Sequence, residues 1–363
     1  MIVYIIKRIS LIFPTLFGIL LLNFLIIQFA PGGPVERTIA KLTHSDANLS
    51  NNFNSFGSEL KTNPAKNITP SKYSGSKGLD PQIIAEIEQL YGFDKPLLSR
   101  FFTMIKDFLS FNFGESFFKG KKVIDLIIER LPVSISLGLW STLIIYLISI
   151  PLGIKKAVKN GSKFDFYTSL IIFIGYSIPS FLFAILLLLL FAKGGAFPIF
   201  PISGITSINF SDLTLIEKIK DYLWHIILPI LSLVIGGFAG LTMLTKNTFI
   251  AEINKQYVIT AKAKGLNNQE ILYKHIFRNA MILVISQIPE TLIKILFTGA
   301  LLIEIIFSLD GLGLLGFEAA INRDYPVIFA TLYIYTLMGL VFNLISDIMY
   351  VLIDPRINFE SKK

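Results

Sequence analysis

The sequence predicts an all-α, polytopic membrane protein with six transmembrane helices and a helical insertion outside the membrane between the first two. Of its residues, 53% are hydrophobic and 16% are charged, and the mean hydropathy is +0.65. Soluble domains average about 25% charged residues. Several apolar segments are long enough to cross a hydrocarbon layer of about 30 Å at about 1.5 Å per residue. Lysine and arginine residues flank these segments, which is typical of membrane spans.

The first span is predicted at residues 9–30, an apolar run that follows Lys7 and Arg8. A cleaved signal peptide is the alternative interpretation. However, the run is longer than the apolar core of a signal peptide, and it ends in Ala-Pro-Gly-Gly-Pro rather than at a small-x-small site. We therefore expect residues 1–30 to form an uncleaved N-terminal transmembrane helix.

Residues 31–133 form the predicted extracytoplasmic insertion. Its part at 43–78 is rich in Ser, Asn, Thr, Lys and Gly without an apolar period, which predicts a mobile loop. The part at 80–131 is predicted to be helical, because Asp80-Pro81 is typical of a helix start and amphipathic patterns follow it. These patterns cover residues 83–90, 97–109 and 123–131. We expect this part to lie on the membrane or cap the bundle, and docking of an external protein is a compatible alternative.

The remaining five spans are predicted within residues 134–353, before a cytoplasmic tail at 354–363. They cover residues 134–154, 166–192, 223–245, 280–303 and 327–352. Prolines lie within or at the ends of these spans and should bend them, since neighbouring helices can satisfy the freed backbone groups. These prolines are Pro151, Pro179, Pro229 and Pro289.

The distribution of basic residues predicts that both termini are cytoplasmic. Under this assignment the two short outer loops hold four lysine or arginine residues, and the cytoplasmic segments hold fifteen. The long insertion does not count, because the positive-inside bias acts on short loops. The fifteen are Lys7, Arg8, Lys155, Lys156, Lys159, Lys163, Lys246, Lys255, Lys262, Lys264, Lys274, Arg278, Arg356, Lys362 and Lys363.

Several classes of chemistry are not expected. The chain has no cysteine, and its three histidines lack metal-ligand spacing. The pattern Gly-x-Gly-x-x-Gly at 311–316 lies between two spans rather than in a strand–helix unit, so it predicts an external re-entrant turn and not a nucleotide site. The phosphate-binding pattern Gly-x4-Gly-Lys-Ser/Thr is absent from the sequence. The net charge of +8 comes mostly from residues that bracket apolar runs, which does not indicate nucleic-acid binding.

A basic segment at 246–279 separates the fourth and fifth predicted spans. Within it, residues 257–264 favour a helix, Gly265 is a natural stop, and Asn267 or Asn268 can cap a second helix. A helix, a sharp break and a second helix make a rigid element that can carry motion between a soluble partner and the membrane. We expect small Ala261 and Ala263 to let the first helix seat closely on such a partner.

This segment resembles the coupling loop, or EAA loop, of permease subunits of binding-protein-dependent ABC importers. The resemblance lies in Tyr257, Ala261, Ala263, Lys264, Gly265 and Leu266, and then in His275, Arg278 and Asn279. It is strongest for the oligopeptide, dipeptide and nickel branch. Ile259-Thr260 stands where the general motif has Glu-Ala, and Arg278 stands where many sugar permeases have proline.

Further motifs follow in the order typical of this branch. Ala30-Pro31-Gly32-Gly33-Pro34-Val35 is similar to the B subunit of microcin-C-type peptide importers. The others are Tyr91-Gly92-Phe93-Asp94-Lys95-Pro96, Phe113-Gly114-Glu115-Ser116, Ser177-Ile178-Pro179-Ser180-Phe181, Asp310-Gly311-Leu312-Gly313 and Asp354-Pro355-Arg356.

The resemblance implies a type I ABC-importer permease fold and a non-catalytic subunit that moves peptides across the cytoplasmic membrane of a bacterium. It implies as partners a second homologous permease, two cytoplasmic ATPase subunits that bind ATP and magnesium, and an extracytoplasmic solute-binding protein. No cofactor is expected on this chain. Import of dipeptides or nickel chelates by the same architecture stays open. An ion-coupled secondary transporter is less well supported, because it has no need of a coupling loop.

Glu290 and Lys294 stand at i,i+4 spacing inside the predicted fifth span. A charge at mid-bilayer costs about 2.5–3.5 kcal/mol on insertion scales, so both should face the bundle and pair with one another. Such a pair either lines the transport pathway or anchors the span structurally, and both interpretations stay open.

The predicted orientation can be tested by cysteine labelling, since the chain has no cysteine of its own. We expect an impermeant thiol reagent to label Thr62→Cys, but not Lys159→Cys, in intact cells. The opposite pattern would show that the topology is inverted.

Overall fold

The computed structural model describes residues 2–29, 95–294 and 301–353. Within these ranges the chain is helical, and its only extended pairings are isolated bridges. Four described helices are long and apolar enough to cross a membrane, and one bent helix pair makes a fifth such element if it is one span. The prediction of an all-α, polytopic membrane protein is confirmed. The predicted loop at 43–78, the helix at 83–90 and the tail lie outside the described residues.

The chain divides into two compact units. One comprises residues 1–14, 125–318 and 331–363, and the other comprises residues 15–124 and 319–330. Both units include residues of the long helices α1 (Ile2–Phe29) and α15 (Tyr325–Ile353).

The smaller unit is held by aromatic rings and one buried carboxylate. The predicted amphipathic helix at 97–109 is confirmed as α4 (Leu97–Leu109). Its Phe101 ring lies 5.6 Å from the Phe17 ring and 5.2 Å from the Phe24 ring, between centroids. The buried Asp324 carboxylate accepts hydrogen bonds from Ser116 Oγ at 2.6 Å and from the Phe117 amide at 3.2 Å. The motif at 113–116 therefore has a structural role in this unit.

In the larger unit, α5 (Val123–Val158) is a single helix. The expectation of a separate amphipathic helix at 123–131 is wrong, whereas the start of the membrane span at residue 134 stays a prediction. Pro132 lies inside α5 and does not end it. A break there would leave several backbone groups without partners, whereas a proline removes only one hydrogen bond.

The predicted third span is a bent pair, α6 (Lys163–Ser177) and α7 (Ser180–Phe191), whose axes differ by 91°. The bend at Pro179 was expected from the sequence, but its size was not. Ile178 before the proline is extended, with φ −86° and ψ 118°, because a proline excludes the helical conformation from the residue before it.

The fourth predicted span lies within α8 (Leu215–Ile253), which follows the short 3-10 turn η1 (Phe210–Asp212). The core of the larger unit surrounds α8. It includes Leu137 and Ile145 of α5, Phe249 of α8 and Val284, each at most 1% exposed.

The predicted fifth span is interrupted. It comprises α11 (Phe277–Ile285), α12 (Gln287–Lys294) and α13 (Leu301–Ile306), and residues 295–300 lie outside the described part. The first break falls at Ser286, because the ring of Pro289 clashes with a helical carbonyl four residues earlier, at Ile285. Two further helices follow, α14 (Leu312–Ile321) and α15.

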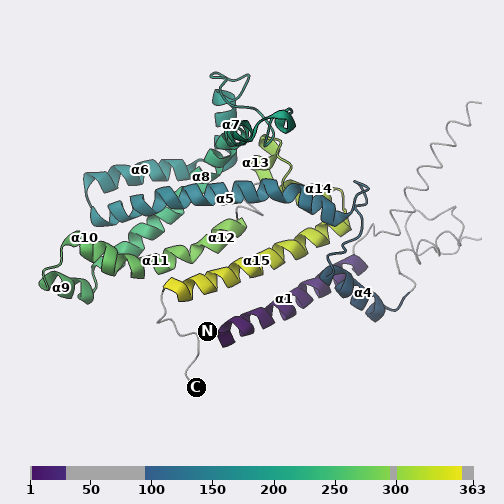
Figure 1. Cartoon of the computed structure of the whole chain (residues 1–363), viewed down its shortest axis with the longest axis horizontal. Coiled ribbons are helices and arrows are strands. Elements are labelled where there is room, and N and C mark those ends of the chain that lie inside the picture. Colours follow the sequence, from purple (N-terminus) through teal and green to yellow (C-terminus); the bar gives the residue numbers. More distant parts are fainter. Residues whose placement is uncertain (1, 30–94, 295–300, 354–363) are drawn as a thin grey trace, which may run out of the picture. The chain divides into compact units, whose positions relative to one another are not determined.

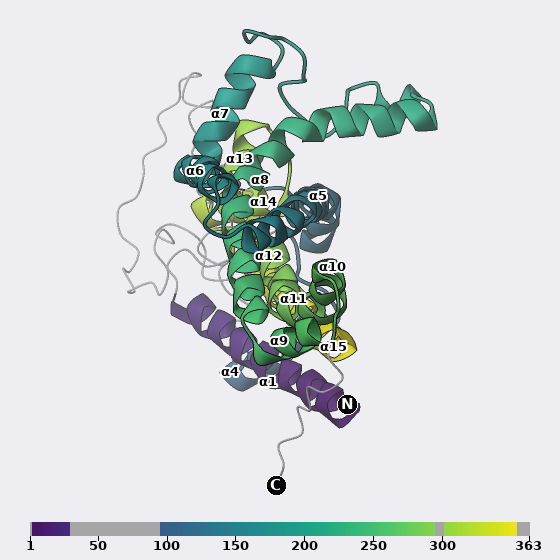
Figure 2. The same cartoon turned by 90° about the vertical axis from the view of Figure 1, so that its left-hand side faces the viewer.

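Within the larger unit, the segment between α8 and α11 lies at one end of these helices (Figure 1). It contains α9 (Gln256–Ala263), α10 (Asn268–Glu270) and a π-helix, η2 (Ile271–Ile276). Figure 2 shows α9 and α10 close to α11 in the view turned by 90°, and both contact η2. The predicted coupling segment is therefore a terminal projection of the larger unit.

Candidate coupling site

The first part of the site is the short helix α9. Its Val258 and Ala261 are 2% and 6% exposed and pack into the core of the larger unit. Lys262, Ala263 and Lys264 are exposed on the other side. The expectation that Ala261 seats against a partner is therefore wrong, because Ala261 packs within its own subunit. Of the two small residues, only Ala263 is accessible.

The turn after α9 has the conformation that the sequence predicts. Gly265 has φ +82°, a value that L-residues with a side chain rarely adopt. Its amide donates to the Lys262 carbonyl at 2.9 Å, and the Leu266 amide donates to the Ala261 carbonyl at 3.3 Å. These bonds close the last turn of α9. An atom added as Cβ on Gly265 would meet nothing within 4 Å, so the glycine is required by conformation rather than by space inside the subunit.

The next helix begins with a reciprocal cap. Asn267 Oδ1 accepts a hydrogen bond from the Glu270 amide at 2.8 Å, and Glu270 Oε2 accepts one from the Asn267 amide at 3.3 Å. This pair satisfies two otherwise unpaired backbone donors. The Asn267 bond, together with the Lys274 ammonium, lowers the pKa of Glu270. The predicted helix stop and cap are confirmed.

A π-helix, η2, joins the capped turn to α11. Ile271 and Ile276 at its ends are 2% and 3% exposed and pack into the core. Tyr273, Lys274 and His275 between them are exposed. Short π-helical stretches are rare and occur frequently at functional sites. Here the wider turn accommodates two buried anchors and an exposed outer face in six residues.

Tyr257 joins three helices at the base of the site. Its hydroxyl donates to Glu252 Oε2 of α8 at 2.7 Å, and Asn279 of α11 also hydrogen-bonds this hydroxyl through its side chain. Lys255 forms an ion pair with the other oxygen of Glu252. Burial, together with the neighbouring Glu252 carboxylate, raises the pKa of Tyr257 to about 12. The tyrosine is therefore a neutral hydrogen-bond donor at neutral pH.

Packed rings connect the outer face of the site to the interior. The Tyr273 and Phe277 centroids lie 6.3 Å apart, and the Phe277 and Phe249 centroids lie 6.0 Å apart. Tyr273 is 63% exposed and Phe249 is 0% exposed. A displacement of the outer face can therefore reach the interior of α8 through direct contacts.

The accessible face combines apolar and basic side chains. Ile259 of α9 is 57% exposed and Tyr273 of η2 is 63% exposed, in a segment that is predicted to face water. The basic and polar residues exposed in this segment include Lys262, Lys264, Lys274, His275, Arg278 and Asn279. Apolar and aromatic anchors with a charged rim suit a protein partner.

The two predicted pathway residues lie apart from this site, on α12. Glu290 is exposed on that helix, and Thr291 beside it hydrogen-bonds Tyr146 of α5. The side chain of Lys294 lies outside the described part, so its pairing with Glu290 stays a prediction. Among the described residues, no group of three His, Cys, Asp or Glu side chains could hold a metal ion.

Glu304 of α13 is a polar residue that the sequence analysis missed. It is 0% exposed, and its Oε2 accepts a hydrogen bond from the Leu314 amide at 2.7 Å. Ser134 of α5 donates to its Oε1 at 3.4 Å and accepts from the Leu312 amide at 2.8 Å. The carboxylate thus caps the first turn of α14.

The glycines at 311–316 make room for this carboxylate. A Cβ on Gly311 would lie 2.1 Å from Glu304 Oε1, and one on Gly313 would lie 3.1 Å from Oε2. The pattern forms the capped start of the short helix α14, and its expected re-entrant position in the membrane stays a prediction. The sequence contains one signal for this cap: the Glu304 carboxylate stands seven residues before Gly311, the first glycine of the pattern.

Comparison with known proteins gives consistent matches. A model of the family described as binding-protein-dependent transport system inner membrane component matches residues 149–359. The inner membrane ABC transporter permease protein YejB of Escherichia coli O157:H7 is 56% identical, over 99% of this chain and 99% of that protein. The peptidoglycan transport system permease protein YejB of Agrobacterium fabrum is 54% identical, over 99% of each chain. The oligopeptide transport system permease protein AppB of Bacillus subtilis is 32% identical, over 98% of this chain and 99% of its own.

Replacing Tyr257 by phenylalanine tests the anchor at the base of the site. The change removes the hydroxyl that joins Glu252 to Asn279 and keeps the ring. Loss of a hydrogen bond to a charged group costs about 1.5–3 kcal/mol, so we expect local opening of α9 to increase by roughly tenfold or more. Hydrogen exchange of the α9 amides measures this opening. Tyr273→Phe, at an exposed tyrosine, is the control. Unchanged α9 protection in Tyr257→Phe would exclude the anchoring role.

Proposed function

The chain belongs to the family of binding-protein-dependent transport system inner membrane components, and we propose that it is the permease subunit of an ATP-driven peptide importer. In this family the permease and the ATPase are separate subunits. The chain therefore conducts the cargo, and its chemistry is limited to binding and movement. A secondary transporter driven by an ion gradient would not need a coupling site.

The observation that carries the proposal is the stiff element from α9 to α11. Its inner side is fixed by the buried residues Val258, Ile271 and Ile276 and by the Tyr257 hydrogen bonds. Its outer side presents Ile259 and Tyr273 to a partner. We assign this outer side as the surface that docks into a groove on a cytoplasmic ATPase. A rigid element is required there, because a flexible loop would absorb the motion of the ATPase.

The remaining partners follow from the family. The proposal includes two cytoplasmic ATPase subunits, a second homologous permease and an extracytoplasmic solute-binding protein, in the cytoplasmic membrane of a bacterium. Both termini are assigned to the cytoplasm from the distribution of basic residues. The ATP and magnesium would bind to the ATPase subunits.

Peptides are the proposed cargo. One of the similar proteins is named for oligopeptide transport and another for peptidoglycan transport. Peptides and the peptide stems of peptidoglycan share amide groups and terminal carboxylates, so one pathway can accept both. Import of a tripeptide, a longer peptide and a peptidoglycan-derived peptide by the reconstituted complex would rank these cargoes.

Glu290 on α12 is proposed to line the pathway, because it is exposed on that helix within a predicted span, and ionisable residues within spans generally face the bundle interior or a water-filled cavity. We expect Glu290→Gln to assemble normally and to lower peptide uptake or change its selectivity between peptides of different charge. An assembled Glu290→Gln complex with unchanged uptake of acidic, neutral and basic peptides would exclude this role.

Gly265→Val tests the coupling site. A β-branched residue at φ +82° is strained by about 1–3 kcal/mol, so the turn between α9 and α10 should change its shape. We expect the subunit to insert and assemble, while ATP-driven uptake and peptide-stimulated ATP hydrolysis fall by roughly tenfold or more. Uptake into proteoliposomes that contain ATP measures the effect.

Gly194→Val is the matched control for this experiment. Gly194 has φ +95°, and a Cβ there would also meet nothing within 4 Å, but it follows α7, whereas Gly265 follows α9 in the coupling segment. We expect this variant to keep peptide-stimulated hydrolysis. A Gly265→Val complex that transports at the wild-type rate would remove the segment from its coupling role. Wild-type uptake driven by a proton gradient without ATP would contradict the proposed function itself.

A further inference from the structure

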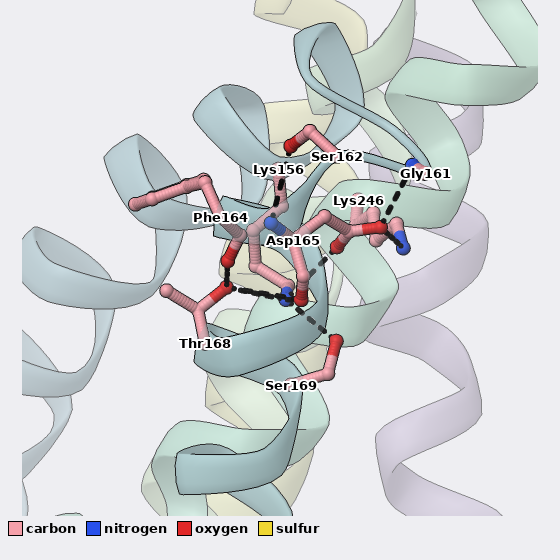
Figure 3. Close-up of polar contacts among 8 residues, drawn as sticks. All are labelled: Lys156, Gly161, Ser162, Phe164, Asp165, Thr168, Ser169 and Lys246. Atoms are coloured by element: carbon pink, nitrogen blue, oxygen red, sulfur yellow. Dashed lines mark hydrogen bonds and ion pairs between the residues drawn. The ribbon is translucent and has the colours of Figure 1, made fainter.

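A fully buried lysine lies at the turn between α5 and α6. Lys156 is 0% exposed, and its Nζ donates to the Asp165 carbonyl at 2.9 Å, Thr168 Oγ1 at 2.9 Å and Ser169 Oγ at 2.7 Å. It also lies 3.0 Å from Asp165 Oδ1. Figure 3 shows these partners converging on the ammonium group. Such a set of acceptors allows a lysine to stay charged when it is buried.

A second lysine reaches the same carboxylate from α8. Lys246 Nζ lies 2.7 Å from Asp165 Oδ2, and the Gly161 amide donates to this oxygen at 3.2 Å. Asp165 is 6% exposed. Its two oxygens therefore hold one lysine from α5 and one from α8, while its own backbone belongs to α6 (Figure 3). We call Lys156, Asp165 and Lys246 the three-helix ion cluster.

Close backbone packing lies next to the cluster. A Cβ on Gly153 of α5 would lie 2.6 Å from Thr245 Cβ and 2.8 Å from the Thr242 carbonyl oxygen of α8. Both threonines are 0% exposed. The helices α5 and α8 are thus in direct contact at the level of the cluster. Sliding α8 past the α5–α6 turn would break the ion pair and this contact together.

The cluster lies on the helix that leads into the coupling site. Lys246 is seven residues before Ile253, the last residue of α8, or about 10 Å along the helix. Glu252, which accepts the Tyr257 hydrogen bond, is six residues after Lys246 on α8. A continuous helix therefore connects the anchor of α9 to the cluster.

We propose that the three-helix ion cluster makes α5, α6 and α8 move as one body, so that a displacement of the coupling site reaches the bent pair α6–α7. Asp165, Lys156 and Lys246 are then positioning residues for transport. This inference rests on the proposed function. A desolvated ion pair suits the task, because it holds a fixed geometry and cannot exchange its partners with water.

The test uses the full complex of this permease with its partners in proteoliposomes. Lys246→Met removes the charge on α8 and leaves Asp165 paired with Lys156. We expect the variant to assemble and to hydrolyse ATP, with peptide taken up per ATP hydrolysed lower by roughly three- to thirtyfold. Lys246→Arg keeps the charge and should restore most of the ratio. Lys163→Met, at an exposed lysine of the same turn, is the matched control and should leave the ratio unchanged.

A purely structural role predicts a different result. Uptake and hydrolysis would then fall in the same proportion as the yield of folded complex, and an unchanged ratio in Lys246→Met would overturn the proposal. If the wild-type complex shows no ATP-driven uptake of peptides, the proposed function fails instead. The ratio of uptake to hydrolysis in the variants therefore tests the role of the ion cluster, and the ATP-driven uptake of the wild type tests the proposed function.

A second measurement keeps the cluster intact and does not depend on the folding of Lys246→Met. Spin labels replace Lys163 and Asn254, which are exposed at the start of α6 and at the end of α8. We expect the distance between the labels to be the same with and without bound ATP. The sample must hydrolyse ATP, which shows that the labelled complex completes its transport cycle. A distance that changes with nucleotide would show that α6 and α8 move separately and would overturn the proposal.

Discussion

The structure depends on the absence of hydrogen-bond partners in the hydrocarbon layer. Each backbone amide and carbonyl inside it must bond within the chain, which favours uninterrupted helices. This constraint explains why α5 continues through Pro132 and α8 through Pro229. Buried polar side chains follow a similar rule wherever the packed protein itself excludes water. Lys156 and Glu304 are both 0% exposed, and each has several hydrogen-bond partners from other segments of the chain.

The helix α8 links most of the functional features of the larger unit. It packs against α6, α7 and α11, and its Phe249 receives the ring contact from Phe277. Toward its C-terminal end it carries Lys246 and Glu252, which reach the α5–α6 turn and Tyr257. A helix is stiff along its axis, so these contacts are connected mechanically as well as in sequence. In the proposed function, the coupling site acts on a body that includes α5, α6 and α8.

The glycine-containing turns solve different physical problems. Gly265 supplies a positive φ where nothing occupies the space of a side chain, whereas Gly311 lacks a side chain so that a carboxylate can approach the backbone. A motif of glycines therefore does not identify its own function. In this chain Gly311 and Gly313 of the Gly-x-Gly-x-x-Gly pattern lie against the Glu304 carboxylate, and the pattern begins helix α14. The space beside these two glycines is therefore filled by a side chain of the same protein.

The sequence by itself determined the helical class, the end of α9 at Gly265, the Asn267 cap and the position of the bend at Pro179. The helical class follows from composition and from long apolar segments, whereas the other three depend on residues within about one helical turn of each other, so local spacing is sufficient to recognise them. Tertiary structure alone decided the continuity of α5, the burial of Ala261 and the roles of Lys156, Asp165, Lys246 and Glu304. Lys246 and Asp165 are 81 residues apart, and Ser134 and Glu304 are 170 apart. Such contacts leave no pattern in the neighbouring sequence, because only the packing of helices brings these polar side chains together in a buried place.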